Sequence, residues 1–185
     1  MLLSSSVWRD NARWWFSGGL LLGGLTTAAV AVVVGSLVRP VVPTVLAAML
    51  MGGLFLVVAG QEFGLYRLRL PQNARQVPQT IVTADSRYGP LQFGFEMGTG
   101  VRTYMTSGLP HILVLGLLLL VPWDVALVSG IAFGGGRAWM ALSRLWHGDV
   151  DAWDYAQRRY DRLTRIVLTV GTGALLVAIL LIAGR

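Results

Sequence analysis

The chain has 185 residues, of which 55% are hydrophobic and 13% charged, a balance too apolar for an ordinary soluble domain. All 15 basic residues are arginine, and the net charge of +6 fits the arginine bias of cytoplasmic membrane loops better than nucleic-acid binding. The chain has no cysteine, which excludes disulfides and thiolate chemistry, and its two histidines argue against a metal or haem site.

The apolar residues form runs of about 20, the length that a helix needs to cross roughly 30 Å of hydrocarbon. We therefore expect an all-α, polytopic transmembrane helical bundle that forms a single integral membrane domain over residues 1–185. The first predicted span, 14–38, is longer than the apolar core of a secretory signal, so we expect it to be retained. A short turn rich in proline leads to a second span at 45–66, and residues 67–87 form a polar loop with four arginines.

The next stretch, from residue 88 to 120, mixes charge with membrane-grade hydrophobicity more closely than any other. It carries Glu96 and Arg102 and then enters a long aliphatic run. Proline, tryptophan and aspartate at 122–124 predict a turn at a membrane face, because an uninterrupted helix would place Asp124 deep in lipid. We expect spans at about 103–121 and 124–144.

The last predicted span, 164–183, is entered through an amphipathic lead that begins at Asp151. The spacing predicts i,i+4 ion pairs, Asp154 with Arg158 and Asp161 with Arg165, each of which stabilises a helix by only a few tenths of a kcal/mol. We expect a surface helix on the cytoplasmic face, with a partner-docking helix as the alternative.

Arginine placement predicts the topology. With the amino terminus in the cytoplasm of a bacterial plasma membrane, twelve arginines face inside, Arg39 and Arg185 face outside, and Arg102 stays in the membrane. This map has five spans plus a re-entrant segment at 89–102. The alternative map makes 89–107 a sixth span and gives two inverted three-helix halves of the transporter kind, against the charge rule.

Glycines recur at the GxxxG spacing that lets membrane helices approach closely. The pairs are Gly19/Gly23, Gly60/Gly64, Gly94/Gly98 and Gly130/Gly134. With 23 glycines about three such pairs arise by chance, so the spacing alone identifies no interface.

The candidate polar intramembrane site consists of Glu62, Glu96, Arg102, Tyr104 and His111. On one helix, Glu96 and Arg102 would point about 120° apart, so they pair only if the intervening glycines break the helix. Glu62, near the end of the second span, is an alternative partner for Arg102. Two interpretations stay open: a site for a proton, ion or solute, and a structural pair that ties the re-entrant segment to its neighbours. His111 fits a hydrogen bond to a neighbouring helix better than a proton-sensitive role.

An apolar helix ending in arginines, then YGPLQFGFEMGTGVRTYMTS and a long aliphatic helix, resembles small uncharacterised membrane proteins of GC-rich actinobacteria. More distantly, residues 45–145 are similar to the transmembrane thiol–disulfide carriers of cytochrome c biogenesis, which have six helices in two inverted halves. Those carriers act through a pair of membrane cysteines, which this chain lacks, so the resemblance implies no redox role for any residue.

No catalytic constellation is visible, and we expect neither an enzyme nor a bound cofactor or metal. The first functional hypothesis is a non-enzymatic membrane subunit that packs on partner helices or on copies of itself, without nucleic acid. The alternative is a small solute, ion or proton transporter or half-transporter, with its site near Glu96 and Arg102.

Overall fold

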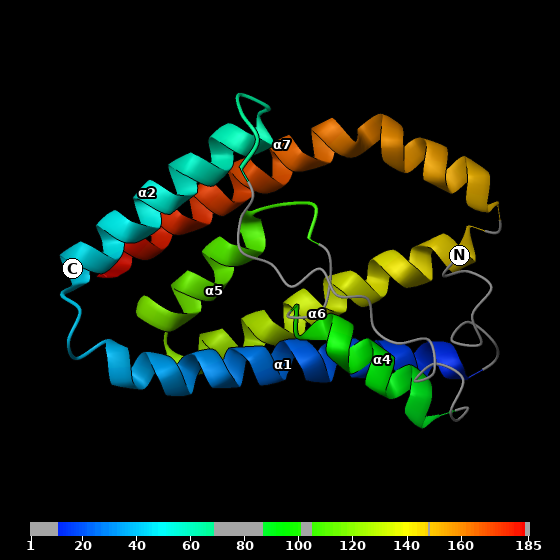
Figure 1. Ribbon diagram of the computed structural model, residues 1–185, viewed down its shortest axis with the longest axis horizontal. Helices are drawn as coiled ribbons and strands as arrows, with labels where there is room; N and C mark the ends of the chain where they lie inside the picture. Colours follow the sequence, from blue (N-terminus) through cyan, green and yellow to red (C-terminus); the bar gives the residue numbers. More distant parts are fainter. Residues whose placement is uncertain (1–10, 69–86, 101–104, 148, 184–185) are drawn as a thin grey trace. The chain divides into compact units, whose positions relative to one another are not determined.

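A computed structural model of the chain describes residues 11–68, 87–100, 105–147 and 149–183. These residues form six helices and no strand. The helices are α1 (Ala12–Val38), α2 (Thr44–Glu62), α4 (Tyr88–Gly98), α5 (Leu109–Leu119), α6 (Trp123–Trp146) and α7 (Val150–Ala183) (Figure 1). Four of them, α1, α2, α6 and α7, are long and apolar enough to cross a membrane. The prediction of an all-α protein with several membrane-length helices is confirmed.

Two predicted boundaries were wrong. The helix expected at 103–121 covers only Leu109–Leu119, about 16 Å at 1.5 Å per residue, because Pro110 near its start disfavours helix in the preceding residues. The amphipathic lead and the last span are joined in one helix of 34 residues, α7. The expected turn before Asp124 is present, and α6 begins at Trp123.

The chain divides into two compact units, each built from segments far apart in sequence. In unit 1, glycines bring the backbones of three helices into contact. Gly19 and Gly23 of α1 face Gly94 and Gly98 of α4, and a Cβ at any of these positions would meet backbone atoms of the other helix. A second face of α1, at Gly24, packs on Gly130 of α6 in the same way. Three of the four GxxxG pairs therefore lie at helix crossings.

The register of these contacts gives the helix directions in unit 1. Gly19 lies beside Leu91 and Phe95, while Gly23 lies beside Phe95 and Thr99, so α1 and α4 run parallel. Gly24 lies beside Gly130, while Leu20 lies beside Gly134, so α1 and α6 run antiparallel. One end of unit 1 thus holds the start of α1, the start of α4 and the end of α6. Exposed aromatic side chains occur near these helix ends: Trp14, Trp15, Tyr88, Trp139 and Trp146.

Unit 2 is built around an aliphatic cluster formed by α2, α5 and α7. Its buried members are Met51, Val58, Ile112 and Leu176. Figure 1 shows α2 and α7 side by side, and Gly173 of α7 packs on the Phe55 ring of α2.

The helix directions in unit 2 also follow from contacts. The end of α2 at Glu62 meets the start of α5 at Gly108, whereas Met51 lies beside Gly116, so α2 and α5 run antiparallel. Glu62 also meets Arg165 of α7, whereas Phe55 meets Gly173, so α2 and α7 run antiparallel as well. One end of unit 2 therefore holds the end of α2 and the start of α5, beside Arg165 of α7.

Candidate functional site

The end of α2 positions the most buried charge among the described residues. The helix closes with a Schellman arrangement: the Leu65 N–H donates to the Gly60 carbonyl (2.9 Å), and the Gly64 N–H donates to the Gln61 carbonyl (2.9 Å). Gly64 has φ +82°, a left-handed conformation that favours glycine. Gly60 and Gly64 thus end a helix, and Gly60 is covered by the Tyr66 ring.

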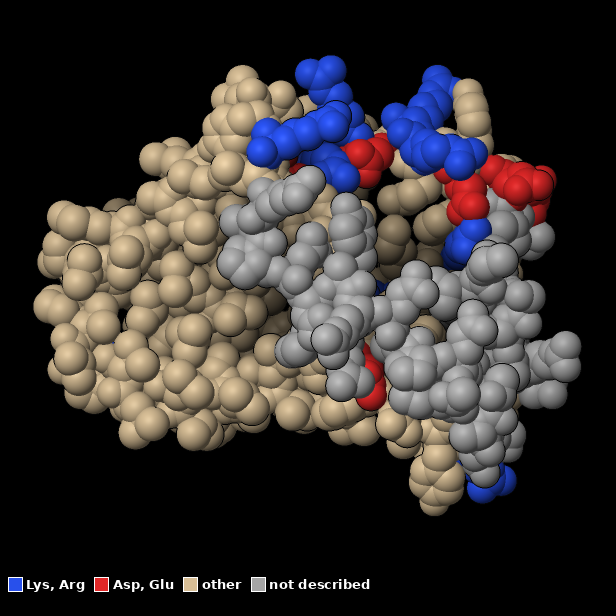
Figure 2. Space-filling model, viewed as in Figure 1, with Lys and Arg blue, Asp and Glu red and all other residues tan. Residues whose placement is uncertain are grey.

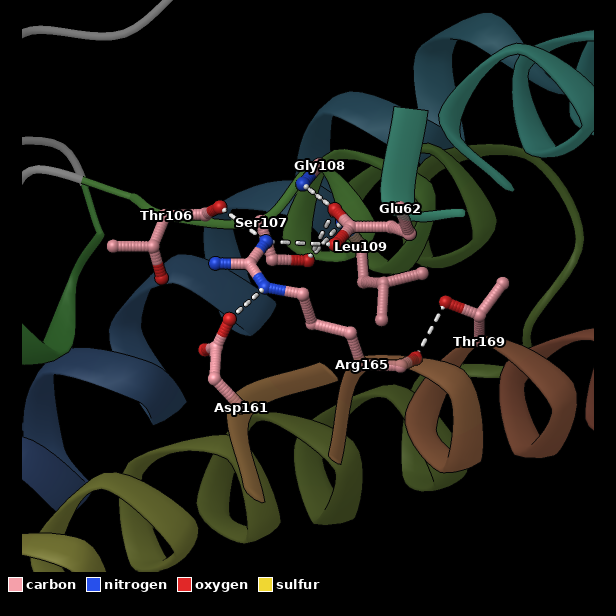
Figure 3. Close-up of polar contacts among 8 residues, drawn as sticks. All are labelled: Glu62, Thr106, Ser107, Gly108, Leu109, Asp161, Arg165 and Thr169. Atoms are coloured by element: carbon pink, nitrogen blue, oxygen red, sulfur yellow. Dashed lines mark hydrogen bonds and ion pairs between the residues drawn. The ribbon is translucent and has the colours of Figure 1, made fainter. Parts of the chain in front are cut away.

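Glu62, the last residue of α2, has a side chain that is only 1% exposed. Its Oε1 accepts hydrogen bonds from the Ser107 hydroxyl (2.8 Å) and from the Gly108 N–H (2.8 Å). Its Oε2 accepts a hydrogen bond from Nη1 of Arg165 (3.0 Å), as Figure 3 shows. Both oxygens of the carboxylate are therefore used by donors of the protein itself.

Arg165 joins three elements of unit 2. Its Nη1 also donates to the Thr106 carbonyl (2.9 Å), and its Nε donates to Oδ2 of Asp161 (2.8 Å). The second contact confirms the predicted i,i+4 pair. The Arg165 side chain is 29% exposed and that of Asp161 is 54% exposed, so the outer pair contributes less to stability than the pair with Glu62. We call Glu62, Thr106, Ser107, Gly108, Asp161 and Arg165 the Glu62 cluster.

The Glu62 cluster satisfies the first backbone groups of α5, which have no partner inside the helix. The Gly108 N–H binds Glu62, the Leu109 N–H donates to the Ser107 hydroxyl (3.2 Å), and Pro110 has no N–H. A carboxylate at this end also complements the positive end of the helix dipole. Glu62 therefore acts as the cap of a helix that belongs to another part of the chain.

Arg39 closes the opposite end of α5. Its Nε donates to the Leu118 carbonyl (2.9 Å) and its Nη2 donates to the Leu117 carbonyl (2.6 Å). A Cβ at Gly35, on the same last turn of α1, would meet the Leu118 carbonyl, so this glycine allows the close approach. A carboxylate at the start of α5 and a guanidinium at its end thus compensate both poles of one short apolar helix.

Three of the five predicted site residues lie in the described part of the chain. Glu62 and His111 belong to unit 2, and the His111 N–H donates to the Gly108 carbonyl (3.0 Å) at the start of α5. Glu96 is half-buried on α4 in unit 1, where its backbone carbonyl accepts a hydrogen bond from the Thr99 hydroxyl (2.7 Å). Arg102 and Tyr104 lie outside the described residues.

Glu62 pairs with Arg165, whereas the partner suggested from the sequence was Arg102. The sequence signal that was missed is the place of each residue relative to an apolar run. Glu62 ends one such run, and Arg165 directly precedes another. When the two helices pack antiparallel, these two residues therefore come to lie at the same end of the helix pair. Arg39 was missed as well, because a lone arginine in a turn shows no target in the sequence.

The contacts of the Glu62 cluster link helices to one another. Charge-assisted hydrogen bonds are roughly twice as strong as neutral ones, and here they connect α2, α5 and α7. Within the described residues, no group of three or more His, Cys, Asp or Glu side chains is placed to hold a metal ion. Comparisons with protein-family models, with curated proteins and with solved structures found no match.

Proposed function

We propose that this chain is a non-enzymatic integral membrane subunit that packs on partner helices in a larger membrane complex. The observation that carries the proposal is the saturation of Glu62: a carboxylate whose oxygens already accept three hydrogen bonds has a structural role in this state. In the described part of unit 2, the charged side chain of Glu62 thus serves to hold helices together.

The surface of α2 supports the same proposal. Gly52 and Gly53 lie in mid-helix with open space where a Cβ would point, and exposed apolar side chains flank them. Small residues at such a place let a further helix approach closely. We propose that a partner helix packs there, either from another protein or from a second copy of the chain.

The topology proposed for the chain has five crossings: α1, α2, α6, α7 and the segment around α5, with α4 as a re-entrant segment. Because α5 is only about 16 Å long, its crossing is completed by the non-helical residues that flank it, which protein must cover. In this map α2 runs opposite to α5 and α7, and α6 runs opposite to α1. These are the directions in each unit, whereas a six-span map makes each of those pairs parallel. By the arginine rule the amino terminus lies in the cytoplasm of a bacterial plasma membrane.

Purification from native membranes in a mild detergent, followed by mass spectrometry, tests the subunit proposal. We expect a stoichiometric partner, or a homo-oligomer, that is lost from Gly53→Leu while the helix content of the variant stays unchanged. Gly136→Leu is a matched control, since Gly136 also has open space around it but lies in unit 1. A chain that stays monomeric in native membranes would contradict the proposal.

The topology is tested separately with Trp123→Cys in this cysteine-free chain. Trp123 is 65% exposed and is the first residue of α6, so in the five-span map a membrane-impermeant thiol reagent should label a cysteine there from outside intact cells. Labelling from the cytoplasmic side alone would contradict the five-span map.

One observation favours the alternative, a small transporter or half-transporter. The short helices α4 and α5 follow one another along the chain, and α4 ends near Gly100, which has φ +71°. Transporters bind substrates and coupling ions where membrane helices are interrupted. Glu96→Gln tests the alternative: loss of solute or proton flux in vesicles, with the fold intact, would favour it over the subunit proposal.

A further inference from the structure

We infer that the end of unit 2 that carries the Glu62 cluster is a binding surface for the headgroups of anionic phospholipids. The inference rests on the proposed membrane embedding of α7 but not on the subunit proposal. Four arginines form the surface: Arg67, just after α2, and Arg158, Arg159 and Arg162 on α7. All four are exposed.

The contacts of the Glu62 cluster place these arginines together. Glu62 at the end of α2 is paired with Arg165, and the two helices run antiparallel, so Arg158 lies beyond the pair at the end of unit 2 where α2 finishes and Arg67 follows five residues after Glu62. On α7, Arg158 and Arg162 are four residues apart and share one helix face. In Figure 2 the arginine side chains gather over the end of α2 and the first half of α7.

The local acids do not neutralise this surface. Arg165 binds both Glu62 and Asp161, so these three side chains together keep a net charge of −1. Asp151 and Asp154 lie within two turns of Arg158 and add −2, so the four arginines (+4) leave a net charge of +1. The surface is therefore suited to an anion from outside the chain.

The depth of the arginines favours a lipid headgroup over a soluble anion. The 18 residues from Ile166 to Ala183 carry no charge, which is enough to cross the hydrocarbon. At 1.5 Å per residue, Arg162 lies about 6 Å before Ile166, within the headgroup layer of a bilayer, and Arg158 lies about 12 Å before it, from where its long side chain can reach back to that layer.

Exposed aromatic residues mark the same level. Tyr155 and Tyr160 are 62% and 53% exposed, and Phe63 and Tyr66 lie beside Arg67 in sequence. Tyrosine is enriched where membrane meets water, because its ring is apolar and its hydroxyl is hydrated. Together with the uncharged stretch of α7 that follows, these tyrosines fit a membrane–water interface.

Native mass spectrometry of the full chain in an uncharged detergent tests the inference. Equal amounts of phosphatidylglycerol and phosphatidylcholine with identical acyl chains are added, and the bound lipids are counted. We expect a clear preference for phosphatidylglycerol, which falls by roughly 100-fold in the triple variant R158Q/R159Q/R162Q, since each of the three arginines near an anionic surface strengthens binding about fivefold.

The triple variant R158K/R159K/R162K is the matched control, because it keeps the charge and should keep most of the preference. Helix content by circular dichroism confirms that each variant is folded. Inorganic phosphate at millimolar concentration should not compete, and competition would assign the surface to soluble anions instead. Equal binding of the two lipids by the unchanged chain, or a preference unaffected by the glutamine substitutions, would overturn the inference.

An acidic protein that co-purifies with the unchanged chain but not with the glutamine variant, in the absence of a lipid preference, would also overturn it. None of these results depends on Gly53 or Trp123. Failure of the lipid surface can therefore be told apart from failure of the proposed subunit role or topology.

Discussion

Replacing Glu62 with glutamine removes the buried charge of the Glu62 cluster while keeping the size of the side chain. The amide has one acceptor oxygen, so its NH₂ group must face either Arg165 or the donors of Ser107 and Gly108. Hydrogen bonds to a charged group contribute about 1.5–3 kcal/mol each, and breaking a buried ion pair costs about 3–5 kcal/mol. Because Arg165 is 29% exposed and can be partly hydrated, we expect the low end, about 3 kcal/mol.

Asp161→Asn is the matched control, since Asp161 binds the same guanidinium from a side chain that is 54% exposed. An exposed i,i+4 pair contributes about 0.3–0.5 kcal/mol. For a chain of this length 1 kcal/mol corresponds to roughly 2–4 °C in Tm, so we expect losses of roughly 6–12 °C for Glu62→Gln and about 1–2 °C for Asp161→Asn. Thermal unfolding of the detergent-solubilised protein, followed by circular dichroism, measures both.

A double-mutant cycle refines the experiment. If Glu62 and Arg165 act as one unit, adding Arg165→Met to Glu62→Gln costs little more than either change alone. Additive losses, or a Glu62→Gln shift as small as that of Asp161→Asn, would refute a structural role for the carboxylate. Glu62 would then return as a candidate for proton or ion binding.

Two further predictions concern the remaining helix contacts. Arg39→Met removes two hydrogen bonds to carbonyls at the end of α5, and we expect a loss of about 2–3 kcal/mol in SDS-induced unfolding, with Arg39→Lys intermediate; equal stability of all three proteins would contradict this. Gly94→Ala places a Cβ against the backbone of α1 and should lower Tm by several degrees, whereas Gly52→Ala meets open space and should raise stability by up to about 1 kcal/mol. Similar effects of the two alanines would contradict the close packing of α1 and α4.

Much of the fold could be predicted because apolar length and glycine chemistry are local signals. Runs of about 20 apolar residues identified α1, α2 and α6, and proline with tryptophan and aspartate identified the start of α6. The start of α5 could not be predicted this way, since apolar length does not show where in the preceding residues a helix begins. Pro110 disfavours helix just before it, and the Ser107 hydroxyl and Gly108 N–H bind a carboxylate on α2 instead.

The same limit applies to the glycines. Gly19/Gly23 and Gly60/Gly64 have the same spacing, yet the first pair contacts α4 and the second ends α2 with a left-handed residue. Only the neighbours distinguish them: α4 offers a facing pair of glycines, whereas Gly64 is followed by Leu65, whose N–H closes the helix. Which residues face a glycine pair is known only once the structure places segments that are distant in sequence next to each other.

Structural and functional charges in a membrane differ in whether their hydrogen-bonding capacity is used up. A short apolar helix exposes N–H groups at one end and carbonyls at the other, and each unsatisfied group is costly in hydrocarbon. For α5 these costs are removed by Glu62 at one end and Arg39 at the other, each matching the sign of the dipole. We therefore propose that the alternative transport function would use groups outside this arrangement, and Glu96 on α4 is the predicted site residue at which that idea can be tested.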